Sequence, residues 1–390
     1  MSISSTDSLR TLSNRTTVEN VVLFISDTLR SDHLPKRVGR SGIAGKMITP
    51  STGTLQSVSA ITTGQYPSRH KLWRKDREQL AKRPELFESR PNYGLGADTS
   101  WVFLDSSEKP IVKVHRLNGE TRVTDLKPPF VYVELDKGGH SPYGIPFEEQ
   151  PDDETFWRGR SNEELKKLYE RGVQKSTERF HELVDTLSAM GVLEETLVVF
   201  LGDHGELLGE VKYGGFYGHA SPLVPEVVTV PVVFLGAGLP KNEQYEPIIS
   251  GVDIAPTLLA AMGKSVPDYM DGDNLWDTAP EMDRIVRSET IQLGEGGVID
   301  SIAPRPVPAY SAVSFWDRSG GYVFHQNNAL VRFVMSQYWK LIGSPPASLT
   351  RKNWTPGNHK RMLEIHCRNQ LTFGDPNFTP DDLSIPSLDY

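Results

Sequence analysis

Two strand-like segments of this chain end in side chains that could bind a metal ion. Asp27 follows the apolar run of NVVLFISD, and Asp203 and His204 follow a second run, TLVVFLGD. Carboxylate and imidazole groups are ordinary ligands of divalent cations. A cation held by Asp27, Asp203 and His204, with a hydroxyl oxygen as fourth ligand, could activate that hydroxyl as a nucleophile. The alternative for each aspartate by itself is a turn or cap residue.

Thr54 is the candidate for the hydroxyl and for the fourth metal ligand. It opens the segment TLQSVSAITTG, in which Leu55, Val58 and Ile61 recur every three residues and Gly64 follows. The spacing predicts a short helix that begins at Thr54. A helix start carries free backbone N–H groups and the positive end of the helix dipole, which suits an anion or an alkoxide. The alternative is a threonine that only caps the helix.

Two histidines lie in glycine-containing loops. Asp136 and His140 belong to LDKGGHSPYG, and His219 belongs to YGHASP. The two glycines of the first loop make it flexible enough to direct Asp136 and His140 toward one point. We therefore expect functional roles for His140 and His219. Surface or satisfied polar roles are expected for seven other histidines, namely His33, His70, His115, His181, His325, His359 and His366.

Strand and helix patterns alternate along the part of the chain that would position these residues. Apolar runs at 21–25, 130–135 and 196–203, and a fourth from residue 230, have the form of strands buried on both faces. This alternation indicates an α/β fold with a mainly parallel central sheet flanked by helices. Ligands of such sheets bind beyond the carboxyl ends of the strands, so the acidic strand ends should converge.

One long amphipathic helix is predicted between the second and third strands. Ser161 stands three residues before Glu164, which is the spacing of a capping box, and Gly191 is placed to end the helix. From about residue 277 the pattern weakens into the short pieces SAVSFW, ALVRFVMS and WKLI and a tail rich in Pro and Asp. We therefore expect a catalytic core over 18–276 and a smaller C-terminal subdomain over 277–390.

Composition narrows the class of protein. The chain has 390 residues, with 42 Lys and Arg against 50 Asp and Glu, and this net charge of -8 argues against a nucleic-acid binder. The single cysteine fits a reducing compartment. The polar first 20 residues lack the apolar core of a signal peptide, and no run reaches the roughly 18 apolar residues of a membrane span. These features predict a soluble cytoplasmic protein of unknown oligomeric state.

The motifs together resemble a known family. NVVLFISDTLRSDHL, TLQSVSAITTGQYPSRH, GGHSPYG, LVVFLGDHGELLGE, YGHASP, VPVVFLG and GVDIAPTLLAAMG occur in the order seen in sulfatase-like members of the alkaline phosphatase superfamily. The resemblance covers roughly residues 18–275. It implies a large α/β sandwich in which a metal-assisted nucleophile forms and then hydrolyses a sulfo- or phospho-enzyme. Asp27, Asp203 and His204 would be metal ligands, Thr54 the nucleophile, and His140 and His219 contacts to the ester or its leaving group.

The sequence departs from the family's sulfate-cleaving members at the nucleophile. Those members carry Cys or Ser in a C-x-P-x-R pattern that is converted to formylglycine, whereas this chain reads TLQSV from Thr54 to Val58. Threonine cannot become formylglycine. Thr54 and the pair Asp203-His204 look closer to the phosphodiesterase side of the superfamily, whose nucleophile is Thr.

The resemblance leaves the number of metal ions open. The phosphodiesterases hold a second metal with a D-x-x-G-H loop and a later His, which Asp136, His140 and His219 match. An H-x-P-Y loop of the sulfatases matches His140 to Tyr143 equally well. One or two divalent ions are expected, and Ca, Mg, Mn and Zn are not distinguished.

These observations favour a metal-dependent hydrolase of phosphate or sulfate esters that works through a covalent Thr54 intermediate. Phosphodiesters or phosphonate monoesters are the favoured substrates, as small molecules or as glycan or lipid esters, and a sulfatase is the named alternative. A second hypothesis is a transferase that passes the phospho-substituent to a sugar or lipid. A third is a binder without catalysis, which the retention of Asp27, Thr54, Asp203 and His204 argues against.

Overall fold

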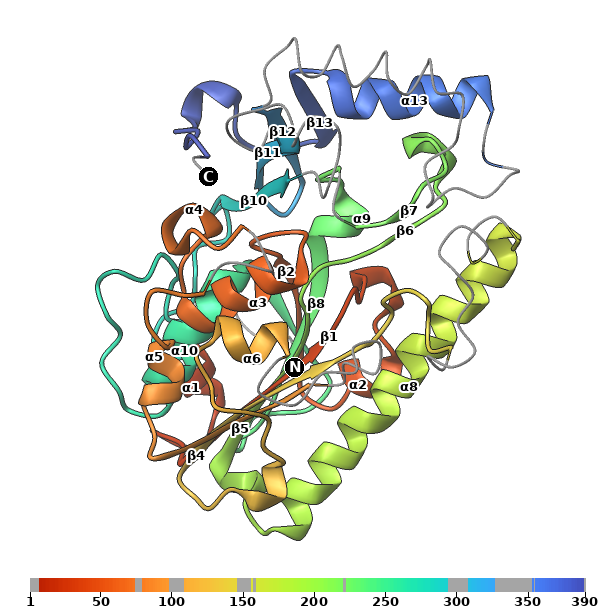
Figure 1. The fold of residues 1–390 in the computed structure, drawn as a ribbon. Coiled ribbons are helices and arrows are strands. Elements are labelled where there is room, and N and C mark those ends of the chain that lie inside the picture. Colours follow the sequence, from red (N-terminus) through yellow and green to blue (C-terminus); the bar gives the residue numbers. More distant parts are fainter. Residues whose placement is uncertain are drawn as a thin grey trace.

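A computed structural model describes most of the chain. The described residues are 7–73, 79–97, 109–145, 156, 159–219, 222–293, 308–326, 353 and 355–388. Within them, the central element is a seven-stranded sheet (Figure 1). Across this sheet the strands are ordered β3 (Asn92–Ala97), β4 (Phe130–Asp136), β1 (Asn20–Ser26), β5 (Thr196–Gly202), β8 (Thr229–Gly236), β2 (Ile43–Ile48) and β9 (Glu243–Ser250).

The directions of the strands determine at which edge of the sheet each strand ends. Neighbouring strands β3, β4, β1 and β5 are all parallel, whereas β8 runs antiparallel to β5 and to β2. The four predicted strands are confirmed as β1, β4, β5 and β8. The three with acidic ends share one edge of the sheet, and β8, which lacks such an end, finishes at the opposite edge.

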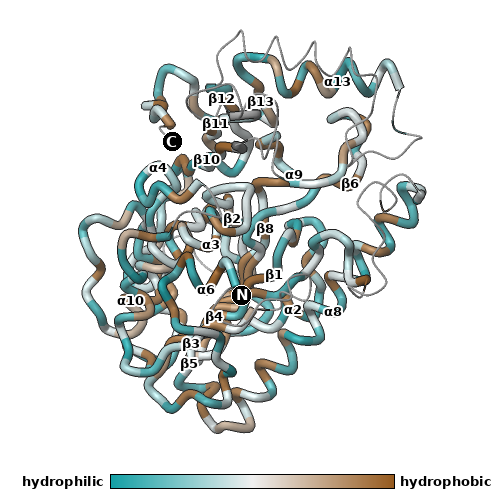
Figure 2. The backbone as a smooth tube through the Cα atoms, viewed as in Figure 1, coloured by the Kyte–Doolittle hydropathy of each residue, from teal (hydrophilic) through white to brown (hydrophobic). Residues whose placement is uncertain are grey.

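Helices cover both faces of the sheet because its strands alternate between two apolar surfaces. Val21, Leu23 and Ile25 of β1 join one core cluster, and Val22 and Phe24 join the other. The first cluster contains residues of α3 (Thr54–Thr63), α5 (Glu85–Glu88), α6 (Pro110–Val114) and α10 (Ile254–Ala261). The second contains α8 (Asn162–Ala189), whose hydrophobic and hydrophilic residues alternate along its length (Figure 2). The predicted α/β sandwich is confirmed.

Helix α8 begins and ends as its sequence predicts. The Ser161 side chain accepts a hydrogen bond from the Glu164 N–H, and the Glu164 side chain accepts one from the Ser161 N–H, so the capping box is formed. Gly191 follows the helix with a left-handed φ of 73°, a conformation that glycine adopts without strain.

A second sheet is formed near the C-terminus. It is antiparallel, in the order β10 (Val286–Leu293), β11 (Pro308–Trp316), β12 (Gly320–His325) and β13 (Gln370–Gly374), and α13 (Pro356–Cys367) accompanies it. The predicted strand SAVSFW lies in β11, whereas ALVRFVMS and WKLI lie outside the described residues. A smaller C-terminal subdomain is therefore present, and its boundary at residue 277 stays a prediction.

Short elements complete the described fold. They are α1 (Leu9–Leu12), α2 (Lys36–Gly39), α4 (Pro67–His70), α9 (Pro225–Val228) and the two-stranded ribbon of β6 (Leu207–Leu208) and β7 (Tyr217–Gly218). Among the described helices, none combines the length and apolar content that crossing a bilayer requires.

Candidate active site and metal centre

The acidic strand ends meet at the carboxyl edge of the central sheet. Ser26 of β1 is in register with Asp136 of β4 and with Gly202 of β5. Asp27 and Asp203 each stand one residue beyond their strands, and the Asp27 N–H donates to the Asp136 carbonyl oxygen at 2.9 Å. The predicted convergence of the three aspartates is confirmed, because adjacent parallel strands of equal register end side by side.

Thr54 reaches this edge from the start of helix α3. Its Oγ1 lies 3.2 Å from His204 Nε2 and 3.5 Å from Asp27 Oδ2. The N-cap of the helix is Gly53, no side chain caps it, and Thr54 is the first helical residue. The interpretation of Thr54 as a helix cap is therefore wrong, and its hydroxyl is directed at the acidic cluster instead.

Asp27, Asp203 and His204 form a group suited to a cation. Among the described residues, theirs is the group of three or more ligand-type side chains whose ligand atoms lie within 4.8 Å of one another. His204 Nε2 lies 3.6 Å from Asp27 Oδ1 and 3.4 Å from Asp203 Oδ2. Both of those oxygens are buried and lack a hydrogen-bond partner. Buried, unpaired carboxylate oxygens that point at one imidazole nitrogen are the donor set a divalent cation would satisfy.

The electrostatics of this group point the same way. Burial raises the pKa of Asp27 well above its ordinary value, and the charges of Asp203 and Glu206 raise it further. Burial also raises the pKa of Asp203 to about 7, although hydrogen bonds from the Thr28 and His204 N–H groups lower it. Two carboxylates this close repel each other unless a proton or a cation lies between them, and a divalent ion would reverse both shifts.

Thr28 sets the direction in which the chain leaves β1. It is fully buried and has a φ of 59°, a left-handed conformation that is costly for a β-branched residue. Its N–H donates to Asp203 Oδ1 at 3.0 Å, and its carbonyl accepts from the Tyr169 hydroxyl at 2.9 Å. These bonds hold the strained residue and join Asp27 to Asp203.

Three histidines share one hydrogen-bonding arrangement around the group. The Nδ1 atoms of His140, His204 and His219 lie 2.5, 3.1 and 2.8 Å from the backbone oxygens of Ser141, Gly205 and Thr52. A carbonyl oxygen can only accept, so each Nδ1 carries the proton and each Nε2 is the unprotonated atom. The His204 and His219 rings stack with centroids 4.2 Å apart, and those of His140 and His219 are 5.4 Å apart.

These histidines are neutral at physiological pH. Burial lowers the pKa of His140 to about 4 and that of His204 and His219 to about 3. The neighbouring imidazole of His219 lowers the His140 pKa further, and that of His204 does the same for His219. Neutral imidazoles can accept a proton, and an anionic ester beside them would raise their pKa.

Asp136 has partners other than His140 and His219. Its Oδ2 lies 3.1 Å from Nη1 of Arg179 on α8, and its Oδ1 accepts from the Gly138 N–H at 2.8 Å. The structure does not bring Asp136, His140 and His219 within mutual ligand distance.

The two glycines of the His140 loop are needed for close packing. A Cβ atom on Gly138, which has a φ of 52°, would lie 2.4 Å from the Asp27 carbonyl oxygen. A Cβ atom on Gly139 would lie 2.4 Å from the Tyr169 ring. The loop is therefore packed closely against the end of β1 and against Tyr169.

Two further residues of the site were not identified from the sequence. Glu206 is 1% exposed, and burial raises its pKa to about 8 although the Tyr143 hydroxyl and the Arg30 charge oppose the shift. Lys137 is buried beside the site, and its charge lowers the pKa of His140. The sequence signal for both was their place inside the GDHGE and LDKGGH motifs, next to residues that were identified.

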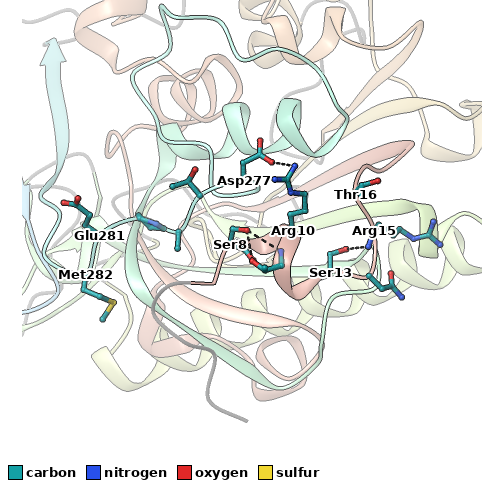
Figure 3. A pocket seen from close by; sticks show the side chains of 13 residues that line it. Ser8, Arg10, Ser13, Arg15, Thr16, Asp277, Glu281 and Met282 are labelled. Atoms are coloured by element: carbon teal, nitrogen blue, oxygen red, sulfur yellow. Dashed lines mark hydrogen bonds and ion pairs between the residues drawn. The ribbon is translucent and has the colours of Figure 1, made fainter.

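A pocket of about 920 Å³ lies elsewhere, between α1 and residues 277–282 (Figure 3). Arg10 and Asp277 form an ion pair of 2.8 Å at its wall. The pocket adjoins the segment that leads into β1, at the end of that strand opposite Asp27. None of the predicted site residues lines it.

Comparisons with known proteins agree with this geometry. Residues 121–264 match the protein family described as Sulfatase. The chain is 39% identical over 350 residues to the low-salt glycan biosynthesis sulfotransferase Agl7 of Haloferax volcanii. This alignment covers 88% of this chain and 84% of that protein. It is 33% identical over 101 residues to arylsulfatase K of Bos taurus, a match of 26% of this chain and 18% of the relative.

The fold is also found among solved structures. The phosphonate monoester hydrolase of Agrobacterium radiobacter superposes with a TM-score of 0.60 at 15% identity, over 79% of this chain and 87% of that chain. At this identity the likeness concerns the fold.

Proposed function

Because the chain belongs to the sulfatase family, we propose that it is a metal-dependent enzyme that transfers the sulfo or phospho group of an ester to Thr54. From Thr54 the group passes to a second oxygen nucleophile. One observation carries this proposal: at the uncapped start of α3, Thr54 Oγ1 lies 3.2 Å from His204 Nε2 and 3.5 Å from Asp27 Oδ2. A threonine hydroxyl needs such activation, because it is a weak nucleophile by itself.

Asp27, Asp203 and His204 would hold a single divalent cation, with Thr54 as fourth ligand. Bound there, the cation would supply Lewis acidity that favours the ionised Thr54 oxygen and offsets charge on the transferred group. The short distances from Thr54 Oγ1 to Asp27 and His204 support its place at this site. The free N–H groups at the start of α3 would add positive potential where negative charge develops.

In the first step, Thr54 Oγ1 attacks the sulfur or phosphorus atom in line with the leaving oxygen. A bond forms between that atom and Oγ1, the bond to the leaving oxygen breaks, and the Thr54 proton ends on the leaving alcohol. His140 or His219 can carry this proton, since both are neutral and keep Nε2 unprotonated.

In the second step, an acceptor oxygen attacks the same atom and Thr54 recovers its proton. With a phospho group, water is an effective acceptor, because the same groups stabilise a second in-line displacement. A sulfated Thr54 has no second hydroxyl on Cβ. It therefore cannot release sulfate by forming an aldehyde, as a formylglycine hydrate does. We therefore expect hydrolysis to favour phosphodiesters or phosphonate monoesters over sulfate monoesters.

Transfer of a sulfo group to a hydroxyl acceptor is the second candidate, and the near full-length likeness to a glycan biosynthesis sulfotransferase favours it. A transferase must keep its covalent intermediate from water until the acceptor arrives. A sulfated Thr54 meets this need, since cleavage of its S–O bond requires direct attack at sulfur. A glycan hydroxyl held in line would be that attacking group.

The test uses the purified chain with Ca, Mg, Mn or Zn and matched nitrophenyl esters: a phosphodiester, a phosphonate monoester and a sulfate. Without an acceptor, we expect kcat/KM to be highest for the phosphorus esters. Added sugar acceptors should accelerate turnover of the sulfate ester and yield a sulfated sugar. A sulfate ester preferred tenfold without acceptor, about 1.4 kcal/mol in transition-state binding, would contradict the argument from Thr54. Absence of turnover with every ester and metal would overturn the proposed function.

A further inference from the structure

Glu206 is a buried carboxyl group that belongs to no other part of the proposed mechanism. It is 1% exposed, stands two residues after His204, and lies outside the group of Asp27, Asp203 and His204. Burying a carboxyl group is costly, so an apolar side chain would serve better if the position only filled space. The contacts of Glu206 therefore indicate its role.

The first contact leads to the loop of His140. The Tyr143 hydroxyl donates to Glu206 Oε1 at 3.0 Å, and Tyr143 is fully buried. The Tyr143 N–H donates to the His140 carbonyl at 2.8 Å, and His140 Nδ1 is bonded to the Ser141 carbonyl. The Tyr143 ring is thus the anchor of a tight turn that contains His140.

A backbone pairing next to Glu206 leads to the loop of His219. Gly218, the residue before His219, pairs with Leu207, the residue after Glu206, in the β6–β7 ribbon. The strand that begins beside Glu206 therefore holds the chain that presents His219.

Arg30 fixes the backbone of Glu206 in turn. Its Nη1 donates to the Glu206 carbonyl oxygen at 3.1 Å, and its backbone N–H donates to the Tyr169 hydroxyl at 3.1 Å. Tyr169 also bonds the Thr28 carbonyl, next to Asp27. The backbone that carries Glu206 is thereby tied to the end of β1.

We infer that Glu206 is a positioning residue that fixes the loops of His140, His204 and His219 relative to one another, through its bond with the Tyr143 hydroxyl and through the backbone pairing of its neighbour Leu207 with Gly218. This inference rests on the proposed function, in which His140 and His219 act on the ester. Without Glu206 the cation ligands stay in place, but the Nε2 atoms of His140 and His219 lose their fixed positions relative to His204. The expected loss is in kcat more than in KM or in metal content.

Two variants break the hydrogen bond between Tyr143 and Glu206 and so test the positioning role. Tyr143→Phe removes the hydroxyl that donates the bond, and Glu206→Ala removes the carboxylate that accepts it. We expect each to lower kcat at least about tenfold with metal content unchanged, and the double variant to lose no more than the larger single loss. Glu206→Gln keeps an acceptor oxygen for Tyr143 and should recover most of the activity.

Tyr132→Phe is the matched control. Tyr132 is buried, and its hydroxyl donates to Oε2 of the partly buried Glu134 at 2.9 Å, in a second tyrosine–glutamate pair that lies within strand β4. If Tyr143 and Glu206 only stabilise the fold, their variants and Tyr132→Phe should lower the melting temperature alike and leave kcat within twofold of wild type. That result would overturn the inference.

A second readout separates this inference from the proposed function. Imidazole ¹⁵N shifts of the histidine-labelled protein, assigned with His140→Gln and His219→Gln, report the tautomers without any substrate. Shifts of the His140 and His219 signals in Tyr143→Phe and Glu206→Ala, but not in Tyr132→Phe, support positioning even if no ester is turned over. Unchanged signals contradict it, whatever the activity of the wild type.

Discussion

At the scale of single residues, the nucleophile position and its surroundings differ together from the formylglycine pattern. Val58 stands where that pattern has Arg, and it is fully buried in the core between α3 and the sheet. An arginine there would place a charge in an apolar cluster. Gln56 stands where the pattern has Pro, and its side chain donates to the Trp73 carbonyl at 3.0 Å. The surroundings of Thr54 at the start of α3 therefore lack both the proline and the arginine of the formylglycine pattern.

Thr54→Ala should reduce kcat by about a thousandfold or more, because it removes the atom that forms the covalent bond. Metal content and melting temperature should change little, since Asp27, Asp203 and His204 remain. Steady-state kinetics with the best nitrophenyl ester, beside metal analysis, measures this.

Two variants serve as references for Thr54→Ala. Thr54→Ser keeps a hydroxyl and should retain measurable turnover. Thr63→Ala, at the other end of α3, loses a hydroxyl that bonds the Ser59 carbonyl and should leave kcat unchanged. Turnover of Thr54→Ala within about tenfold of wild type, or about 1.4 kcal/mol, would exclude a nucleophile at this position.

At the scale of elements, helices α3 and α6 are joined by a buried histidine. His115, the C-cap of α6, bonds the Ile111 carbonyl through Nδ1 at 2.8 Å, and its Nε2 lies 2.9 Å from the Thr62 hydroxyl. The Thr62 hydroxyl also donates to the Val58 carbonyl at 2.9 Å, within α3. The contact with His115 helps to hold the helix that carries Thr54.

Protonation of His115 should therefore destabilise the fold as the pH falls. Burial lowers its pKa from 6.5 to about 4. The unfolded chain takes up this proton below pH 6.5 and the folded chain only near pH 4, so stability is full above 6.5 and decreases between these values. The difference between the two pKa values corresponds to a loss of roughly 3 kcal/mol in the free energy of unfolding across this pH interval.

Denaturant unfolding at pH 4 to 7 measures this effect. His115→Gln, which has no group that titrates in this range, should show a shallower pH dependence than wild type by about that amount. An equal slope for both proteins would show that His115 is not responsible.

At the scale of the whole molecule, the second sheet supports the loop that leads to Thr54. The Glu289 N–H of β10 donates to the Pro50 carbonyl at 2.8 Å, and the Thr52 and Thr290 hydroxyls are 3.1 Å apart. The Glu289 carboxylate accepts from the N–H and hydroxyl of Ser68. The catalytic edge of the large sheet is thus held from the C-terminal side as well.

Metal binding should couple to the stability of this assembly. We expect one divalent ion per chain at saturation, and an ion at a hundred times its Kd should stabilise the fold by about 2.7 kcal/mol. Elemental analysis and thermal unfolding with and without chelator measure both quantities. Two ions per chain would instead restore Asp136, His140 and His219 as a second site.

Asp203→Asn is the control variant for the effect of metal on stability. It should lose the metal-dependent rise in melting temperature. In chelator it should be at least as stable as wild type, because it replaces one of two buried, repelling carboxylates by a neutral group. Lower stability than wild type in chelator would show that Asp203 is mainly structural.

Features of the fold that depend on short-range patterns could be predicted from the amino-acid sequence. The apolar runs of β1, β4 and β5, the capping box of α8 and the glycine that follows it each form from neighbouring residues, so a local pattern is enough. Since parallel strands end at one edge, the same runs also predicted that Asp27, Asp136 and Asp203 would meet.

Features that depend on partners distant in the chain could not be predicted from local patterns and are seen only in the folded structure. The antiparallel direction of β8 follows from the path between two sheet strands, which no local pattern encodes. Asp136 forms an ion pair with Arg179, 43 residues later, a contact that no local pattern predicts. Glu206 reads as an ordinary loop residue until folding removes it from water and brings Tyr143 to it. The burial of a charge and the choice of its partner are set by packing, and packing exists only in the folded molecule.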